Sequence, residues 1–139
     1  MGDIGTDEQI LDNCREAVKL NLLEQTVDVI GLSWGSCNPD FLKVNGNLDF
    51  IIGSDLFYDP SIFNSLCSTI SQLLVFNPLA KVYVAVQIRS EDWSLEEHFR
   101  RWSLRGNVIF PKDFLRGTGI EEDDLAGKHS IFILEICRQ

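Results

Sequence analysis

Hydrophobic residues recur at steps of three and four in three parts of the chain, which is the spacing of one face of an α-helix. The first helix is predicted to begin at the capping sequence TDEQ, residues 6–9. The second is predicted to begin at the acid-proline pair of residues 59–60 and to end at the Asn-Pro pair of residues 77–78. A third is predicted to begin between residues 92 and 94 and to end at Gly106. In the first helix these residues, which fall on one helical face, are Ile10, Leu11, Cys14, Val18 and Leu22.

Short apolar runs lie between and after these helices, and each predicts a β-strand. The runs cover residues 27–34, 48–53, 80–88, 107–110 and 130–137. The run AKVYVAVQI is almost continuously apolar, which indicates a strand buried on both faces. An acidic segment, GTGIEEDDLAG, is expected to form a solvated loop before the last strand. The alternation of strands and helices predicts an α/β fold with a mostly parallel sheet and helices on both faces.

The length and charge of the chain restrict what it can be. At 139 residues it is expected to form a single domain, residues 1–139, with a sizeable core. Twelve basic against 21 acidic residues give a net charge of −9, which argues against direct binding of nucleic acid. The same charge favours basic partners, with simple solubility as the equally weighted alternative. Neither a membrane-spanning run nor a signal peptide is visible, so we expect an intracellular protein without membrane contact.

The cysteines and histidines do not predict a metal site. The four cysteines are far apart in the sequence, and neither histidine lies close to any of them. Zinc sites usually have closely spaced ligand pairs, and no C-x-x-C pair occurs. We therefore expect no metal and reduced, buried cysteines.

Polar, acidic and aromatic residues lie where the predicted strands end. In parallel sheets, ligands bind at these carboxyl ends of the strands. In DFIIGSDLFYDP an apolar strand runs into Ser54, Asp55 and Tyr58. Each candidate has a structural alternative: Asp55 can cap a turn, Trp34 can be a core aromatic residue, and Asp3 can be a disordered terminal residue. A receiver domain is disfavoured, because the acidic pair after the first strand and the lysine after the last parallel strand are missing. A D-x-D-x-T phosphatase is disfavoured as well, because Asp55 is followed by Leu56 and Phe57.

Four segments occur in a specific order: GDIGTDEQILDNCREAVKLN, LSWG, LDFIIGSDLFYDP and VYVAVQIRSEDWSLEE. Over nearly the whole chain they resemble the seven-strand, S-adenosylmethionine-dependent protein methyltransferases of the methyltransferase-like family. The resemblance implies a Rossmann-like fold whose C-terminal strand is antiparallel to the others. It also implies methyl transfer to a basic side chain of a histone-like protein in the cytoplasm or nucleus, with arginine favoured over lysine as the acceptor.

The resemblance also implies roles for five residues. Asp3 matches the acid that holds the ribose of S-adenosylmethionine, Trp34 the aromatic residue near the adenine, and Ser54 a small residue lining the cofactor pocket. Asp55 and Tyr58 match the ends of the D-x-x-Y motif that faces the methyl-accepting side chain. Methyl transfer is an in-line displacement that depends on alignment, and a carboxylate beside an aromatic ring suits a cationic acceptor.

No G-x-G opens a helix after a strand, although the family carries a glycine-rich cofactor turn before the acid that Asp3 matches. We therefore expect an N-terminally truncated fold that lacks the first two strands and the first helix, and doubt that this chain alone binds the cofactor. Strand edges that are central in the family's sheet would then be exposed, which predicts self-association. The alternative to an enzyme is a shortened, non-catalytic module for protein binding or dimerisation.

Overall fold

The computed structural model describes residues 8–36, 48–87, 94–120 and 131–139. Its helices are α1 (Glu8–Leu20), the short 3-10 helix η3 (Pro60–Ile62), α2 (Phe63–Phe76), α3 (Glu96–Arg101) and α4 (Pro111–Phe114). Its strands are β1 (Phe50–Ser54), β2 (Lys81–Gln87), β3 (Leu104–Ile109) and β4 (Ile131–Arg138). Within these ranges, no helix combines the length and the apolarity needed to cross a membrane.

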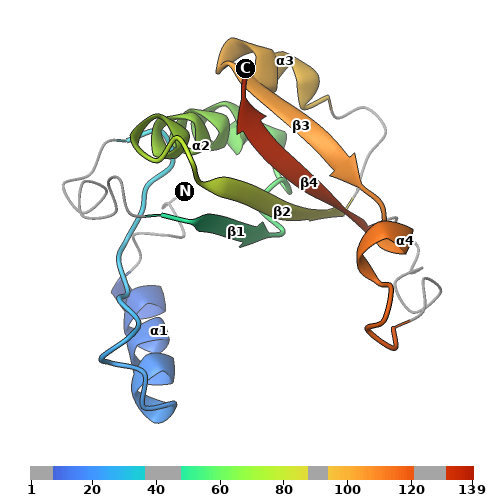
Figure 1. The fold of residues 1–139 in the computed structure, drawn as a ribbon. Coiled ribbons are helices and arrows are strands. Elements are labelled where there is room, and N and C mark those ends of the chain that lie inside the picture. The colour runs from blue at the N-terminus through green and yellow to red at the C-terminus, as the bar shows by residue number, and fades with distance from the viewer. Residues whose placement is uncertain (1–7, 37–47, 88–93, 121–130) are drawn as a thin grey trace.

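The four strands form one sheet in the order β1-β2-β4-β3 (Figure 1). β1 pairs with β2 in parallel, and β4 pairs antiparallel with both β2 and β3. Strands β1, β2 and β3 therefore run in one direction, and the C-terminal strand alone runs in the other. This confirms the predicted α/β fold with a mostly parallel sheet and an antiparallel C-terminal strand.

Helices α2 and α3 cover one face of the sheet and form the core with it (Figure 1). On β2, valines at alternate positions point into this core, as the two-residue period of a strand requires. The predicted helix after Asp59 is confirmed as η3 followed by α2, and Asn77 caps its end by donating its backbone N–H to the Leu73 carbonyl at 2.9 Å. The buried apolar residues are Phe57, Phe63, Leu66, Cys67, Ile70, Leu73, Leu74, Val82, Val84, Val86, Phe99, Leu104, Leu134 and Ile136.

The opposite face of the sheet is open in the part of the chain that the structure describes. On β1, the side chain of Phe50 is 60% exposed and that of Ile52 is 81% exposed. On β2, Tyr83, Ala85 and Gln87 are half-buried between the fully buried valines. The expectation that β2 is buried on both faces is therefore wrong for these residues, because the helices that pack on it lie on one side only.

Two sequence-based expectations about local structure are also wrong, and one predicted helix packs differently from the others. Residues 27–34 form no strand, because no neighbouring strand among the described residues offers them a hydrogen-bond ladder. The predicted first helix is present as α1, but it has no buried residue, since it stands apart from the sheet (Figure 1). Gly106 does not end a helix but lies inside β3, where an added Cβ would meet the Phe99 ring at 2.6 Å. The acidic segment 117–127 falls mostly outside the described residues.

The expectation of buried cysteines holds for one of the three that the structure describes. Cys14 on α1 is exposed, Cys67 on α2 is buried and Cys137 is half-buried, and all three are free thiols. Burial raises the pKa of the Cys67 thiol to about 12, because the charged thiolate loses its hydration there. Cys67 is therefore a packing residue rather than a nucleophile.

The exposed side chains of β1 lead to a prediction about assembly. β1 pairs only with β2 among the described strands, so its other edge presents unpaired backbone groups beside Phe50 and Ile52. Such an edge is a template for another chain. We expect the 15.8 kDa chain to elute as a self-associated species in size-exclusion chromatography with light scattering. Ile52→Lys should shift it towards the monomer, and a monodisperse wild-type monomer would contradict this prediction.

Candidate functional site

The site begins where β1 ends beside β2. Ser54 is in register with Ala85, and the backbone N–H of Asp55 donates to the Ala85 carbonyl at 3.2 Å, which extends the pairing by one residue. Asp55 then adopts φ +54°, a left-handed conformation that is uncommon outside glycine. The ladder thus fixes Asp55 at the carboxyl end of the strand, and the turn points the chain back towards the core.

Two apolar residues anchor the turn that follows Asp55. Leu56 folds back over Gly53, where a Cβ would meet Leu56 Cδ1 at 2.5 Å, so a larger residue at position 53 would displace the Leu56 side chain. Phe57 is 3% exposed and meets the ring of Phe63 edge-on, with the ring centroids 5.4 Å apart. The D-x-x-Y motif is therefore held by its two middle residues, which pack inward.

The last residues of the motif return to the surface. Tyr58 is 37% exposed. Next to it, Asp59 caps η3 by accepting a hydrogen bond from the Ser61 backbone N–H at 2.9 Å. That bond to the charged form lowers the pKa of the Asp59 carboxyl. Asp59 is thus a structural cap, as the sequence predicted. Asp55 is the acid of the D-x-x-Y motif and lies at the strand ends.

A hollow of about 210 Å³ lies at the carboxyl ends of β1 and β2 and is lined by Ser54, Asp55, Ala85, Val86, Gln87 and Ile131. Two of the predicted site residues, Ser54 and Asp55, therefore come together in one place. Ser54 and Ala85 share a register position, and Gln87 follows Ala85 by two residues, so these side chains belong to the open face of the sheet. Sequence reasoning missed Gln87, although its position at the end of the clearest strand was a usable signal.

The remaining predicted site residues lie elsewhere. Trp34 is half-buried and packs against the hydrophobic core, and it is not part of the lining of the hollow. Its neighbour Gly35 donates its backbone N–H to Thr69 Oγ1 of α2 at 2.8 Å, which ties this segment to the covered side of the sheet. Tyr58 also stands outside the hollow. Asp3 lies outside the described residues.

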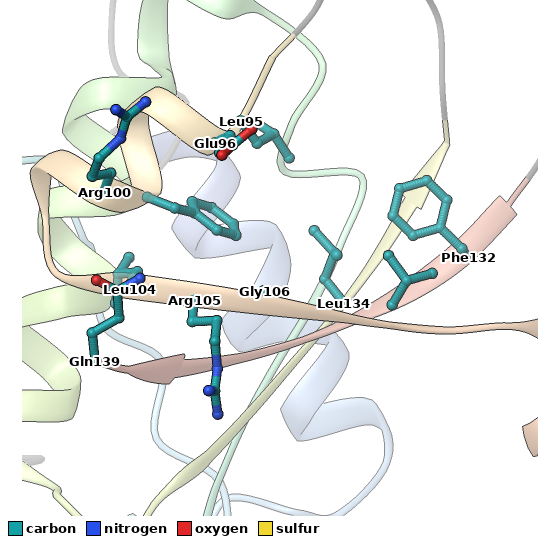
Figure 2. A pocket seen from close by; sticks show the side chains of 11 residues that line it. Leu95, Glu96, Arg100, Leu104, Arg105, Gly106, Phe132, Leu134 and Gln139 are labelled. Carbon is teal, nitrogen blue, oxygen red and sulfur yellow. The ribbon is translucent and has the colours of Figure 1, made fainter.

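A larger hollow of about 480 Å³ lies between α3 and strands β3 and β4 (Figure 2). Its lining is mainly apolar and includes Phe99, Phe132 and Leu134. The guanidinium groups of Arg100 and Arg105 point to opposite sides of β3, so they do not converge on a common ligand (Figure 2). No residue of the parallel strands β1 and β2 lines this hollow, so the smaller one remains the better candidate. Within the described ranges, no group of three His, Cys, Asp or Glu side chains is placed to hold a metal ion.

Comparison with known proteins identifies the family to which the chain belongs. Residues 3–101 match the sequence profile of the lysine methyltransferases. The chain belongs to the lysine methyltransferase family. The match covers Asp3, Trp34, Ser54, Asp55 and Tyr58, and it also covers Gln87.

The chain is similar to curated members named histone-arginine methyltransferase METTL23. It is 34% identical to the Xenopus laevis protein over 98% of this chain and 58% of that protein. It is 36% identical to the Mus musculus protein over 91% of this chain and 49% of that protein. For the Homo sapiens protein the identity is 33% over 91% of this chain and 66% of that protein. The chain thus spans about half to two thirds of the length of these relatives.

Membership of a methyltransferase family implies S-adenosylmethionine as the methyl donor. Ligand pockets usually measure about 300–1,000 Å³, whereas the hollow beside Asp55 measures about 210 Å³. Its size and its exposed acid fit the acceptor side chain better than a whole cofactor. Of the residues predicted to contact the cofactor, Ser54 alone lines this hollow.

Proposed function

We propose that the chain carries the acceptor half of an S-adenosylmethionine-dependent protein methyltransferase that acts on arginine side chains of a basic protein such as a histone. The observation that carries the proposal is the position of Asp55, which the β1–β2 ladder and the buried Phe57 hold beside the hollow at the strand ends. Family membership supports methyl transfer, and the names of the METTL23 relatives support a histone arginine. An intracellular place of action, cytoplasmic or nuclear, goes with this substrate.

The chain's own residues would work mainly by alignment. S-adenosylmethionine, when bound, supplies an electrophilic methyl group on its sulfonium, and Ser54, with Asp3 and Trp34, would contribute to its binding. Asp55 would hold the cationic acceptor by a charge-assisted hydrogen bond and accept its proton. Tyr58 would offer an aromatic face to the same cation. Orientation of donor and acceptor is a major part of the rate of such displacements.

Arginine and lysine remain competing acceptors under this proposal. The matched family is described as lysine methyltransferases, whereas the METTL23 relatives are named histone-arginine methyltransferases. The net charge of −9 suits either cation. We propose arginine because these relatives match more than nine tenths of the chain, including the strand ends.

A second candidate function is a non-catalytic module that binds or pairs with other chains. The exposed edge of β1, with Ile52 81% exposed, favours it. The small volume of the hollow beside Asp55 favours it as well. Such a module would keep the acceptor-facing surface and lack methyl transfer.

Titration calorimetry separates the two functions. S-adenosylmethionine, and separately its demethylated product, would be titrated into the 139-residue chain, followed by a methylation assay on core histones with radiolabelled donor. Micromolar binding together with label on histone arginine supports the enzyme. Absence of both binding and label contradicts it for this chain and leaves the binding module.

A further inference from the structure

Gln87 is a polar side chain at the candidate site that family membership and the relatives' names do not assign. It is the last residue of β2, two positions after the alanine whose carbonyl accepts the Asp55 N–H. It pairs across the sheet with Ile131 of β4, and both line the hollow with Asp55. The amide and the carboxylate thus come from the ends of adjacent parallel strands and share one hollow.

The side-chain amide of Gln87 has hydrogen-bonding groups without a protein partner in the part of the chain that the structure describes. The residue is half-buried, and its side chain forms no hydrogen bond within the described part of the chain. By contrast, the half-buried Gln72 on α2 donates its Nε2 to Ser68 Oγ at 3.1 Å. The Gln87 amide thus has no protein partner among the described residues and lines the hollow beside Asp55, where it is open to a ligand.

We propose that Gln87 determines specificity for arginine over lysine by accepting an N–H of the substrate guanidinium through Oε1, beside Asp55. This inference rests on the proposed function, since it concerns the acceptor of the same methyl transfer. A guanidinium is planar and presents five N–H donors in a fixed fork, so it can reach two acceptors on neighbouring strands at once. A lysine ammonium is a compact, strongly hydrated charge that is served by the carboxylate and water alone.

The neutrality of the amide is part of the specificity. A second carboxylate at position 87 would add negative charge and attract any cation, whereas an amide adds an acceptor without charge. Gln87→Glu should therefore strengthen binding of a lysine side chain and reduce the preference for arginine. Gln87→Met keeps length and packing but removes the acceptor, so it should weaken arginine binding selectively.

The test uses two capped tripeptides, Gly-Arg-Gly and Gly-Lys-Gly, titrated into the ¹⁵N-labelled 139-residue chain and followed by NMR. We expect the arginine peptide to shift the side-chain amide signals of Gln87. Gln87→Met should raise the Kd of the arginine peptide roughly ten-fold or more, the loss expected for a hydrogen bond to a charged group. The Kd of the lysine peptide should change less than about three-fold, which is below the effect of such a bond. Gln72→Met on α2 is the matched control and should leave both Kd values unchanged.

Three results would overturn the inference: no binding of either peptide, an unchanged arginine Kd in Gln87→Met, or an equal loss for both peptides. The peptide titration needs no cofactor, so its failure is distinct from that of the proposed function. Selective arginine binding through Gln87 without methyl transfer supports the inference and contradicts catalysis by this chain. Methyl transfer to arginine, with the preference for arginine over lysine unchanged in Gln87→Met, would support catalysis and contradict the inference.

Discussion

Replacing Asp55 by alanine is expected to abolish methyl transfer while sparing cofactor binding. Asp55 is the acid of the D-x-x-Y motif that lines the hollow at the strand ends, so its loss removes the group proposed to hold and deprotonate the acceptor. Acid–base groups of this kind typically contribute about 10²- to 10⁴-fold in rate. The measurement is single-turnover transfer to core histones, with calorimetry of S-adenosylmethionine on the same variant. Unchanged histone methylation by Asp55→Ala would refute the assignment.

The backbone at Asp55 decides which variants are informative. Its φ of +54° is a conformation in which alanine is strained by about 1–3 kcal/mol, whereas asparagine and glycine tolerate it. Asp55→Asn and Asp55→Gly should therefore keep the free energy of unfolding within about 1 kcal/mol of wild type and still lose transfer. Asp49→Asn, at the other end of the same strand, is the matched control and should transfer normally. Transfer lost in Asp55→Ala but kept in Asp55→Gly would mean that the alanine acts through the backbone.

The helices and strands that carry the core could be predicted from the sequence because their signals are local. The apolar runs at β2 and β4 and the acid-proline start before η3 and α2 each point to one structure. The first predicted strand, residues 27–34, failed because a strand depends on a partner that the run itself does not encode. The position of α1 apart from the sheet could not be predicted for the same reason, since an apolar helix face does not identify the surface against which it packs.

The candidate site could be predicted only in part. Ser54 and Asp55 are adjacent in sequence at a predicted strand end, and both line one hollow in the structure. Gln87 joins them through the parallel register of β1 and β2, which sequence periodicity does not give. The sequence also did not show that Trp34, which the family resemblance places near the cofactor, packs half-buried against the core. The left-handed backbone of Asp55 could not be foreseen either, because it follows from the ladder and from the packing of the next two residues.

Phe63→Ala is expected to be the most damaging substitution for stability. The Phe63 side chain is 1% exposed and packs edge-on against Phe57, which anchors the turn after Asp55. Removing a buried phenylalanine typically costs about 3–5 kcal/mol, through lost transfer free energy and the cavity left behind. Small domains have only about 5–15 kcal/mol of total stability. The measurement is urea unfolding followed by circular dichroism, in which the midpoint should fall sharply.

The effect of Phe63→Ala should also reach the site before the chain unfolds. Phe57 meets both Phe63 and Phe99, the latter with ring centroids 6.1 Å apart, so one of its two aromatic partners remains in the variant. The turn should then be held more loosely, and binding of the arginine peptide should weaken under conditions where the variant is still folded. Phe110→Ala, at a side chain 54% exposed, is the control and should change stability by less than about 0.5 kcal/mol. Equal losses in the two variants would mean that the Phe57–Phe63 contact is not what holds Asp55 in place, and the turn would owe its position to the β1–β2 ladder alone.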